Sequence, residues 1–147
     1  PVLKEHNISG ITLAMKNHYG SIPLSDNIPM SLFDIRAMHA NNGNPQIAQL
    51  NASPLIKEKT KLIVCDALLG IFNGGPDGHP QWANNQLIVS TDPVATDYHG
   101  MLIIDSMRKE KGLSSIAPKA RYIDTAAELG LGINNPHKID TRMLELG

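Results

Sequence analysis

The apolar residues of this chain cluster in two kinds of pattern. Residues 61–66 (KLIVCD) are a short, continuous apolar run, which is typical of a strand buried on both faces, and residues 86–90 (QLIVS) predict the next strand. Residues 1–4 (PVLK) read as the end of another strand, and residues 138–145 (KIDTRMLE) predict a last one. Strands that alternate with helical segments predict an α/β fold, with a small, mostly parallel sheet and flanking helices.

Capping residues, apolar spacing and terminating glycines mark the helical segments. Ser9 and Gly20 flank the first, and Thr91 or Asp92 followed by Pro93 begins the longest. Helices are predicted over residues 10–18, 32–40, 45–51, 93–111 and 121–129. Residues 67–84, which contain GGPDGHP, are predicted to form a long loop of the kind that is functional or mobile.

Length and composition limit the class of protein. The 147 residues suffice for one domain with its own core and are short for two. The strand-like start and the few strands indicate a single α/β domain over residues 1–147 that is a fragment of a larger domain, with its upstream half missing. The hydrophobic content of 41% and charged content of 18% are typical of soluble globular proteins. A net charge of −1 offers no attraction to nucleic acid, and no apolar run approaches the ~18 residues of a membrane span.

Cys65 is the only cysteine of the sequence. A single cysteine excludes an internal disulfide, a cysteine-rich zinc site and an iron–sulfur cluster within this chain. Its position in the apolar run LIVC predicts a small buried core residue.

Three polar features are expected beyond the carboxyl ends of strands, where open α/β sheets bind ligands. Asp66 ends a predicted strand. It either caps a neighbouring turn or pairs with a lysine, or it is a metal ligand or general base. Gly74 and Gly75 either let the backbone approach a ligand or form an ordinary glycine-rich turn. Asp92 either caps the following helix or binds a ligand.

Asp97 is one helical turn further along, on the same face as Val94, Met101 and Ile104. A carboxylate on such a buried stripe needs a hydrogen-bonding partner. A structural hydrogen bond from Asp97 to a nearby loop is therefore predicted.

The segment HNISGITLAMKNHYG, residues 6–20, has an apolar middle and hydrogen-bonding residues at both ends. His6 follows the first strand and is expected at the carboxyl edge of the sheet. Lys16 and Asn17 end the predicted helix, where they either complement the helix dipole or hold a carboxylate or phosphate. His39 is on an apolar helix face, as a satisfied core histidine or as a ligand.

The motifs PVLKEH, GITLAMKNHYGSIP, IVCDALLGIFNGGP and LIVSTDPVATD, with His39 between the second and third, resemble the domain of unknown function 362 family. The resemblance runs from residue 1 to about residue 105. It implies that the matching positions form a site, and these are His6, Gly10, Thr12, Lys16, Asn17, Gly20, His39, Asp66, Gly74, Gly75, Pro76, Asp92, Pro93 and Asp97. It also implies an association with ferredoxin-like modules. The compartment stays unknown: cytoplasmic, or exported by a twin-arginine signal that this fragment lacks.

Two functions agree with these residues. The first is an enzyme, or enzyme half, that binds an anionic small molecule at the carboxyl edge of the sheet. Its catalytic residues are Lys16, Asp66 and His6, and its ligand-binding residues are Asn17, Gly74, Gly75 and Asp92. Its metal-assisted version holds zinc, iron or manganese through His6, His39 and Asp66.

The second function is a non-catalytic binding or electron-transfer domain. Its partner would be an iron–sulfur module on another segment or chain. The first function requires His6, Lys16 and Asp66 to lie within about 12 Å of one another, the reach of a small-molecule site.

Overall fold

The computed structural model describes residues 1–22 and 34–145, and its centre is a four-stranded sheet. The strand order is β2-β1-β3-β4, with β1 (Val2–His6), β2 (Gly10–Thr12), β3 (Ile63–Ile71) and β4 (Trp82–Ser90). β1 pairs in parallel with β3, whereas β2 pairs antiparallel with β1 and β4 antiparallel with β3. The α/β fold class is confirmed, but the expectation of a mostly parallel sheet is wrong. Both antiparallel pairs arise because a short loop joins strands that are consecutive in the chain.

The β3–β4 hairpin is longer than the sequence pattern predicts. Each strand has nine residues, so strand segments take up both ends of the predicted loop 67–84 and leave residues 72–81 as the loop. Along the first part of β3, Ile63 and Cys65 are buried whereas Val64 is half exposed. The strand is therefore buried on one face there, and it reads as a continuous apolar run because its outward positions are apolar as well.

Residues 10–18 do not form the predicted helix. They form β2 and then the start of the 3-10 helix η1 (Met15–Ser21). Gly10 has a φ of +78°, and a Cβ atom there would lie 2.9 Å from the carbonyl oxygen of Ile116. The turn at Gly10 therefore folds the chain back onto β1, where Thr12 pairs with Lys4.

The helices mostly agree with the predicted ranges. α2 (Gln46–Ala52), α4 (Pro93–Glu110) and α5 (Tyr122–Glu128) confirm three of them. α1 (Ile35–Met38) confirms part of the predicted helix 32–40, of which residues 32 and 33 lie outside the described residues. The remaining helical elements are short: η2 (Ala40–Gly43), α3 (Pro54–Lys57), η3 (Ala117–Lys119) and η4 (Pro136–Lys138).

The predicted last strand is wrong. Residues 139–145 form no strand, and the side chains of Met143 and Leu144 are 75% and 84% exposed. Strand-like alternation does not specify a strand here because this segment buries no face against the sheet.

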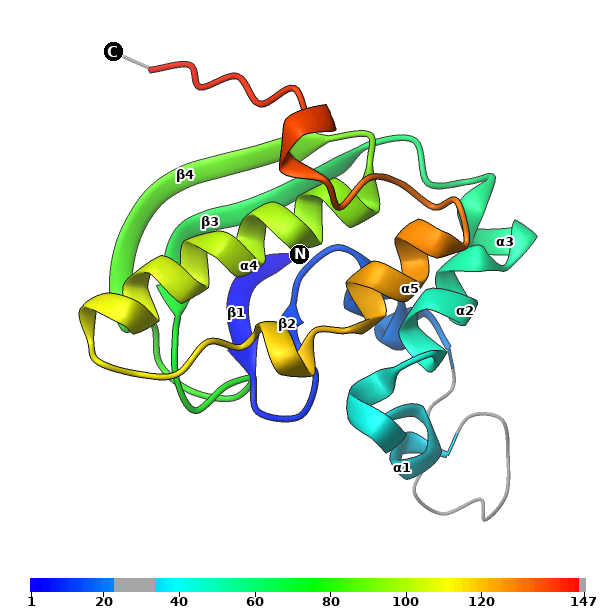
Figure 1. The fold of residues 1–147 in the computed structure, drawn as a ribbon, viewed down its shortest axis with the longest axis horizontal. Helices are drawn as coiled ribbons and strands as arrows, with labels where there is room; N and C mark the ends of the chain where they lie inside the picture. The colour runs from blue at the N-terminus through cyan, green and yellow to red at the C-terminus, as the bar shows by residue number, and fades with distance from the viewer. Residues whose placement is uncertain (23–33, 146–147) are drawn as a thin grey trace.

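Helix α4 crosses one face of the sheet, and α2, α3 and α5 lie beside the β2 edge (Figure 1). The core between α4 and the sheet includes Val94, Met101 and Ile104. Cys65 is fully buried in the same core, as predicted, and burial raises the pKa of its thiol to about 11. The other face of the β3–β4 hairpin is open, with Val64, Leu87 and Val89 at least half exposed.

Candidate functional site

His6 ends β1, at the carboxyl edge of this strand, as predicted. Its Nδ1 atom accepts hydrogen bonds from the backbone N–H groups of Ile8 and Ser9, both at 3.1 Å. Nδ1 is therefore unprotonated, and the neutral ring carries its proton on Nε2. Burial, followed by the charge of Lys16, lowers the pKa of His6 to about 3, so the ring is neutral at physiological pH.

Lys16 and His39 form the second part of the site. Nζ of Lys16 lies 3.0 Å from Nε2 of His39, and Nδ1 of His39 lies 2.7 Å from the carbonyl oxygen of Ile35. The carbonyl only accepts, so His39 donates to it through Nδ1–H, and Nε2 accepts from Lys16. The His39 ring stacks on the ring of His6, with centroids 5.4 Å apart and an interplanar angle of 17°.

Tyr19 closes one side of this arrangement. Its ring meets His39 edge-on at 5.3 Å between centroids, and Nζ of Lys16 lies 4.7 Å from the centre of the Tyr19 ring. Its hydroxyl donates to the carbonyl oxygen of Met38 at 2.5 Å, and burial raises the pKa of that hydroxyl. Tyr19 thus ties η1 to the end of α1 and fixes Lys16 relative to His39. We call His6, Lys16, Tyr19 and His39 the His6–Lys16 cluster.

The His6–Lys16 cluster lies in a positive electrostatic environment. Lys4 and Lys119 contribute, after Lys16 and His39, to the lowered pKa of His6, and Nζ of Lys119 donates to the carbonyl oxygen of Asn7 at 2.8 Å. Burial, followed by the charge of Lys4, lowers the pKa of Lys16 to about 8. Within residues 1–22 and 34–145 the only ion pairs join Arg36 to Asp34 and Arg142 to Asp140, so Lys16 has no carboxylate partner there.

The glycine-rich loop is attached to the strand that ends in His6. The N–H of Gly75 donates to Oε2 of the buried Glu5 at 2.7 Å, and the N–H of Asn7 donates to the carbonyl oxygen of Gly75 at 3.2 Å. A Cβ atom at position 75 would lie 1.9 Å from the carbonyl oxygen of Glu5, so only glycine fits. The structure thus places Gly75 beside the end of β1, next to His6.

The family model of the domain of unknown function DUF362 matches residues 1–101, which include the whole His6–Lys16 cluster and Gly75. The chain belongs to the DUF362 family. Neither the curated proteins nor the solved structures contain a match to it. In the described segments, no helix combines the length and apolar character that a bilayer crossing requires.

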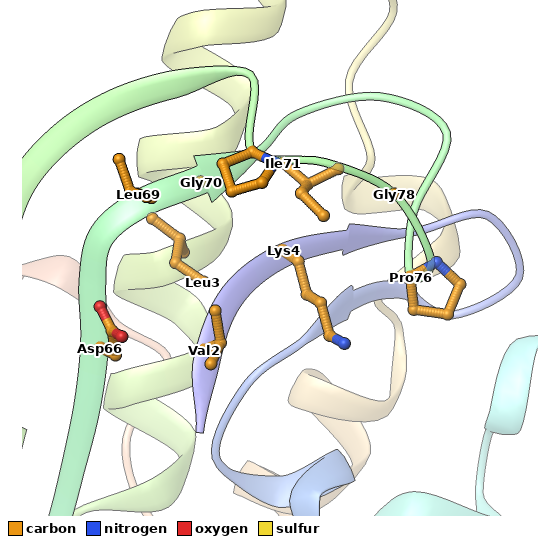
Figure 2. A pocket seen from close by; sticks show the side chains of 10 residues that line it. Val2, Leu3, Lys4, Asp66, Leu69, Gly70, Ile71, Pro76 and Gly78 are labelled. Carbon is orange, nitrogen blue, oxygen red and sulfur yellow. The ribbon is translucent and has the colours of Figure 1, made fainter.

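The prediction that Asp66 ends a strand is wrong, because Asp66 lies within β3. It pairs with Val2 at the start of β1, four residues before His6, which corresponds to about 13 Å along a strand. Its Oδ1 accepts the N–H of Leu68 at 3.0 Å. Figure 2 shows Asp66 beside Val2, whereas Pro76 of the glycine-rich loop lies toward the other end of β1. These residues line a separate hollow of about 280 Å³.

Asp92 and Asn17 are engaged elsewhere. Asp92 caps α4, as predicted: its Oδ1 accepts from the N–H of Ala95 at 2.8 Å and its Oδ2 from that of Ile133 at 2.9 Å. Asn17 is exposed and lines a different hollow, of about 860 Å³, with Pro1 and other residues. Gly74 has a φ of +78°, with open space where its Cβ would point.

The predicted metal ligands do not form a common site in this DUF362 chain. The described residues contain no group of three or more histidine, cysteine, aspartate and glutamate side chains that could hold a metal ion. Nδ1 of His6 and both ring nitrogens of His39 are engaged by protein groups, and Asp66 is at the other end of β1.

Four residues of the site were not singled out from the sequence: Lys4, Glu5, Tyr19 and Lys119. Glu5 has a sequence signal, because it is a charged residue two positions from the buried Leu3 on the same face of a strand. Tyr19 follows Lys16 by three residues, the spacing of side chains that meet on a 3-10 helix. Lys4 is two positions from His6 on β1, so the two share a face of the strand, whereas Lys119 reaches the site through the tertiary fold alone.

Proposed function

We propose that this DUF362 chain binds a small anionic molecule at the His6–Lys16 cluster. The observation that carries the proposal is Lys16, a residue only 8% exposed, whose ammonium has no carboxylate partner in the described part of the chain. An unpaired buried charge is costly, and a bound anion would offset that cost.

The chemistry of the cluster supports a carboxylate or phosphate group as the ligand. His39 accepts a hydrogen bond from one of the three N–H groups of Lys16, which leaves two for a ligand. The neutral His6 ring presents Nε2–H as a further donor. Lys4 and Lys119 add positive potential without an ion pair of their own in the described residues. The proposal keeps the anionic ligand predicted from the sequence. It bases the site on His6, Lys16 and His39, without Asp66, Asn17 or Asp92.

Thermal unfolding with and without added anions tests the proposal. Inorganic phosphate and acetate are compared with chloride at equal ionic strength, in the wild-type chain and in Lys16→Gln. We expect phosphate or acetate to raise the melting temperature of the wild type, because a ligand that binds only the folded state stabilises it. The rise should disappear in Lys16→Gln.

The matched control is Lys109→Gln, which removes the same charge from the exposed end of α4. Its melting temperature should rise with phosphate or acetate as in the wild type. Equal responses of Lys16→Gln and the wild type would overturn the proposal, and would favour the alternative of a partner domain that docks without a small-molecule site.

A further inference from the structure

We propose that Lys16 is a nucleophile that forms an imine with the carbonyl carbon of an anionic oxo compound, such as a 2-oxo acid, and that His39 accepts the proton released by the amine. This inference rests on the proposed function, since the same cluster must first attract the anionic group. It adds a reaction and a substrate class.

The geometry of the pair supports a proton transfer. Nζ of Lys16 and Nε2 of His39 are 3.0 Å apart, within the reach of an amine and its general base. The Nδ1–H of His39 is held by the carbonyl oxygen of Ile35, which keeps Nε2 unprotonated and directed at Lys16. The order of nucleophile, base and orienting group is thus Lys16, His39 and the Ile35 carbonyl.

The surroundings of Lys16 favour the neutral amine, which is the reactive form. The side chain is buried and has Lys4 as a neighbouring cation in place of a carboxylate. These effects lower its pKa to about 8, so about a tenth of Lys16 is neutral at pH 7, against well under a thousandth for an ordinary lysine. Desolvation and a neighbouring cation are the means by which enzymes activate lysine.

The reaction balances with groups that are present. The nitrogen lone pair forms a C–N bond to the carbonyl carbon, and the C=O π electrons move to oxygen. The attacking nitrogen gives one proton to Nε2 of His39, which passes it to that oxygen, and the product is a carbinolamine. His39 then takes the second proton of the nitrogen and delivers it to the hydroxyl group, which leaves as water while the C=N bond forms. The sum is amine plus carbonyl to imine plus water, without an oxidant or reductant. The carboxylate of the 2-oxo acid, next to the reacting carbonyl group, would lie in the positive field of Lys4 and Lys119 and accept a hydrogen bond from Nε2–H of His6.

Reductive trapping tests the inference. The wild-type chain is incubated with pyruvate and sodium borohydride, and digestion followed by mass spectrometry locates the reduced adduct. We expect modification at Lys16 to exceed that at any exposed lysine at least tenfold. Lys16→Arg, which keeps a cation at this position, should lose the adduct, and Lys109→Arg should keep it. His39→Gln should slow trapping by about a hundredfold, the contribution of a general base.

A parallel measurement with lactate, which has the carboxylate but no carbonyl, separates the two proposals. If pyruvate and lactate both raise the melting temperature and no adduct forms at Lys16, the imine is overturned while anion binding stands. If neither compound raises the melting temperature and no adduct forms, both proposals fall. An adduct spread evenly over exposed lysines also overturns the imine. Trapping in the wild type needs no variant to fold.

Discussion

Oδ1 of Asp97 accepts a hydrogen bond from the backbone N–H of Ala14 at 2.6 Å, although the two residues are 83 positions apart. Its Oδ2 accepts from the N–H of Met15 at 3.3 Å and from the hydroxyl of Tyr122 at 3.0 Å. The predicted structural hydrogen bond of Asp97 is thus confirmed. Its two backbone partners are the residues that precede Lys16, so Asp97 fixes the backbone from which Lys16 projects.

Asp97→Ala should therefore lower the stability of the fold. The substitution leaves the buried N–H groups of Ala14 and Met15 without an acceptor and removes the shorter of the two hydrogen bonds of the Tyr122 hydroxyl. Each unsatisfied donor costs about 1–3 kcal/mol, and we expect a loss of about 3 kcal/mol after partial rearrangement. Urea unfolding followed by circular dichroism measures it. Asp140→Ala removes an exposed carboxylate and should change the free energy of unfolding by less than about 0.5 kcal/mol. Equal losses in the two variants would show that the Asp97 contacts do not stabilise the fold.

Asp97 should also give stability a distinct pH dependence. Burial raises its pKa from 3.8 to about 7, against the hydrogen bonds from Tyr122, Ala14 and Met15. The folded state therefore binds more protons than the unfolded state between these values, and this contribution falls as pH rises from about 4 to about 7. His6, whose pKa is lowered, acts in the opposite direction below pH 6.5.

The difference in the free energy of unfolding between the wild type and Asp97→Asn separates the contribution of the aspartate from that of the histidines. The free energy of unfolding of the wild type, measured relative to the variant, should decrease from pH 4 to pH 7 and level off above. A difference that stays constant over this interval would show that Asp97 does not titrate there.

Local signals in the sequence predict the helices after residue 30 and fail for residues 10–18. The cap Asp92, followed by Pro93 at the first helical position, defines the start of α4 without reference to the rest of the chain. The sheet was predicted less well, because pairing is a property of distant segments. Residues 10–12 became a strand because β1 offered an edge to pair with, which overrides the helical spacing of Ile11, Ala14 and Met15.

The residues of the site show the same difference between local signals, which can be predicted, and contacts between distant segments, which cannot. His6 could be predicted at the carboxyl edge because it ends β1, and Gly75 because its loop follows β3 in the chain. Asp66 looked equivalent, but the hairpin extends β3 well beyond it and the parallel register places it beside Val2. The contact of Lys16 with His39 depends on where α1 and η1 meet, which no spacing in the sequence encodes.

Gly75→Ala should displace the glycine-rich loop from the end of β1. The added methyl group would meet the carbonyl oxygen of Glu5, and the hydrogen bond from the Gly75 N–H to Glu5 would be lost. We expect about 2 kcal/mol of destabilisation and faster hydrogen exchange at the N–H groups of Asn7 and Gly75, measured by NMR. Gly20→Ala is the control, because nothing lies within 4 Å of its added Cβ. Unchanged exchange in Gly75→Ala would contradict the close approach.

Lys4→Gln should raise the pKa of Lys16. Burial is the main cause of the lowered pKa and Lys4 the second, so removal of Lys4 favours the charged ammonium and moves the pKa upward from about 8. NMR titration of the side-chain resonances of Lys16 measures this pKa directly. Lys109→Gln should leave it unchanged. A pKa of Lys16 near 10.5 in the wild type would contradict its burial beside a second cation.

The parallel pairing of β1 with β3 also has a consequence for the order of folding. β3 and β4 meet through a short loop, whereas β1 reaches β3 only after the whole segment containing η1, α1, α2 and α3 has been closed. Closing such a long loop costs entropy before any contact compensates it, and non-local pairing of this kind slows folding. We therefore expect the β3–β4 hairpin to form first and β1 to join late. His6, Gly75 and Lys16 would then come together in the last step of folding.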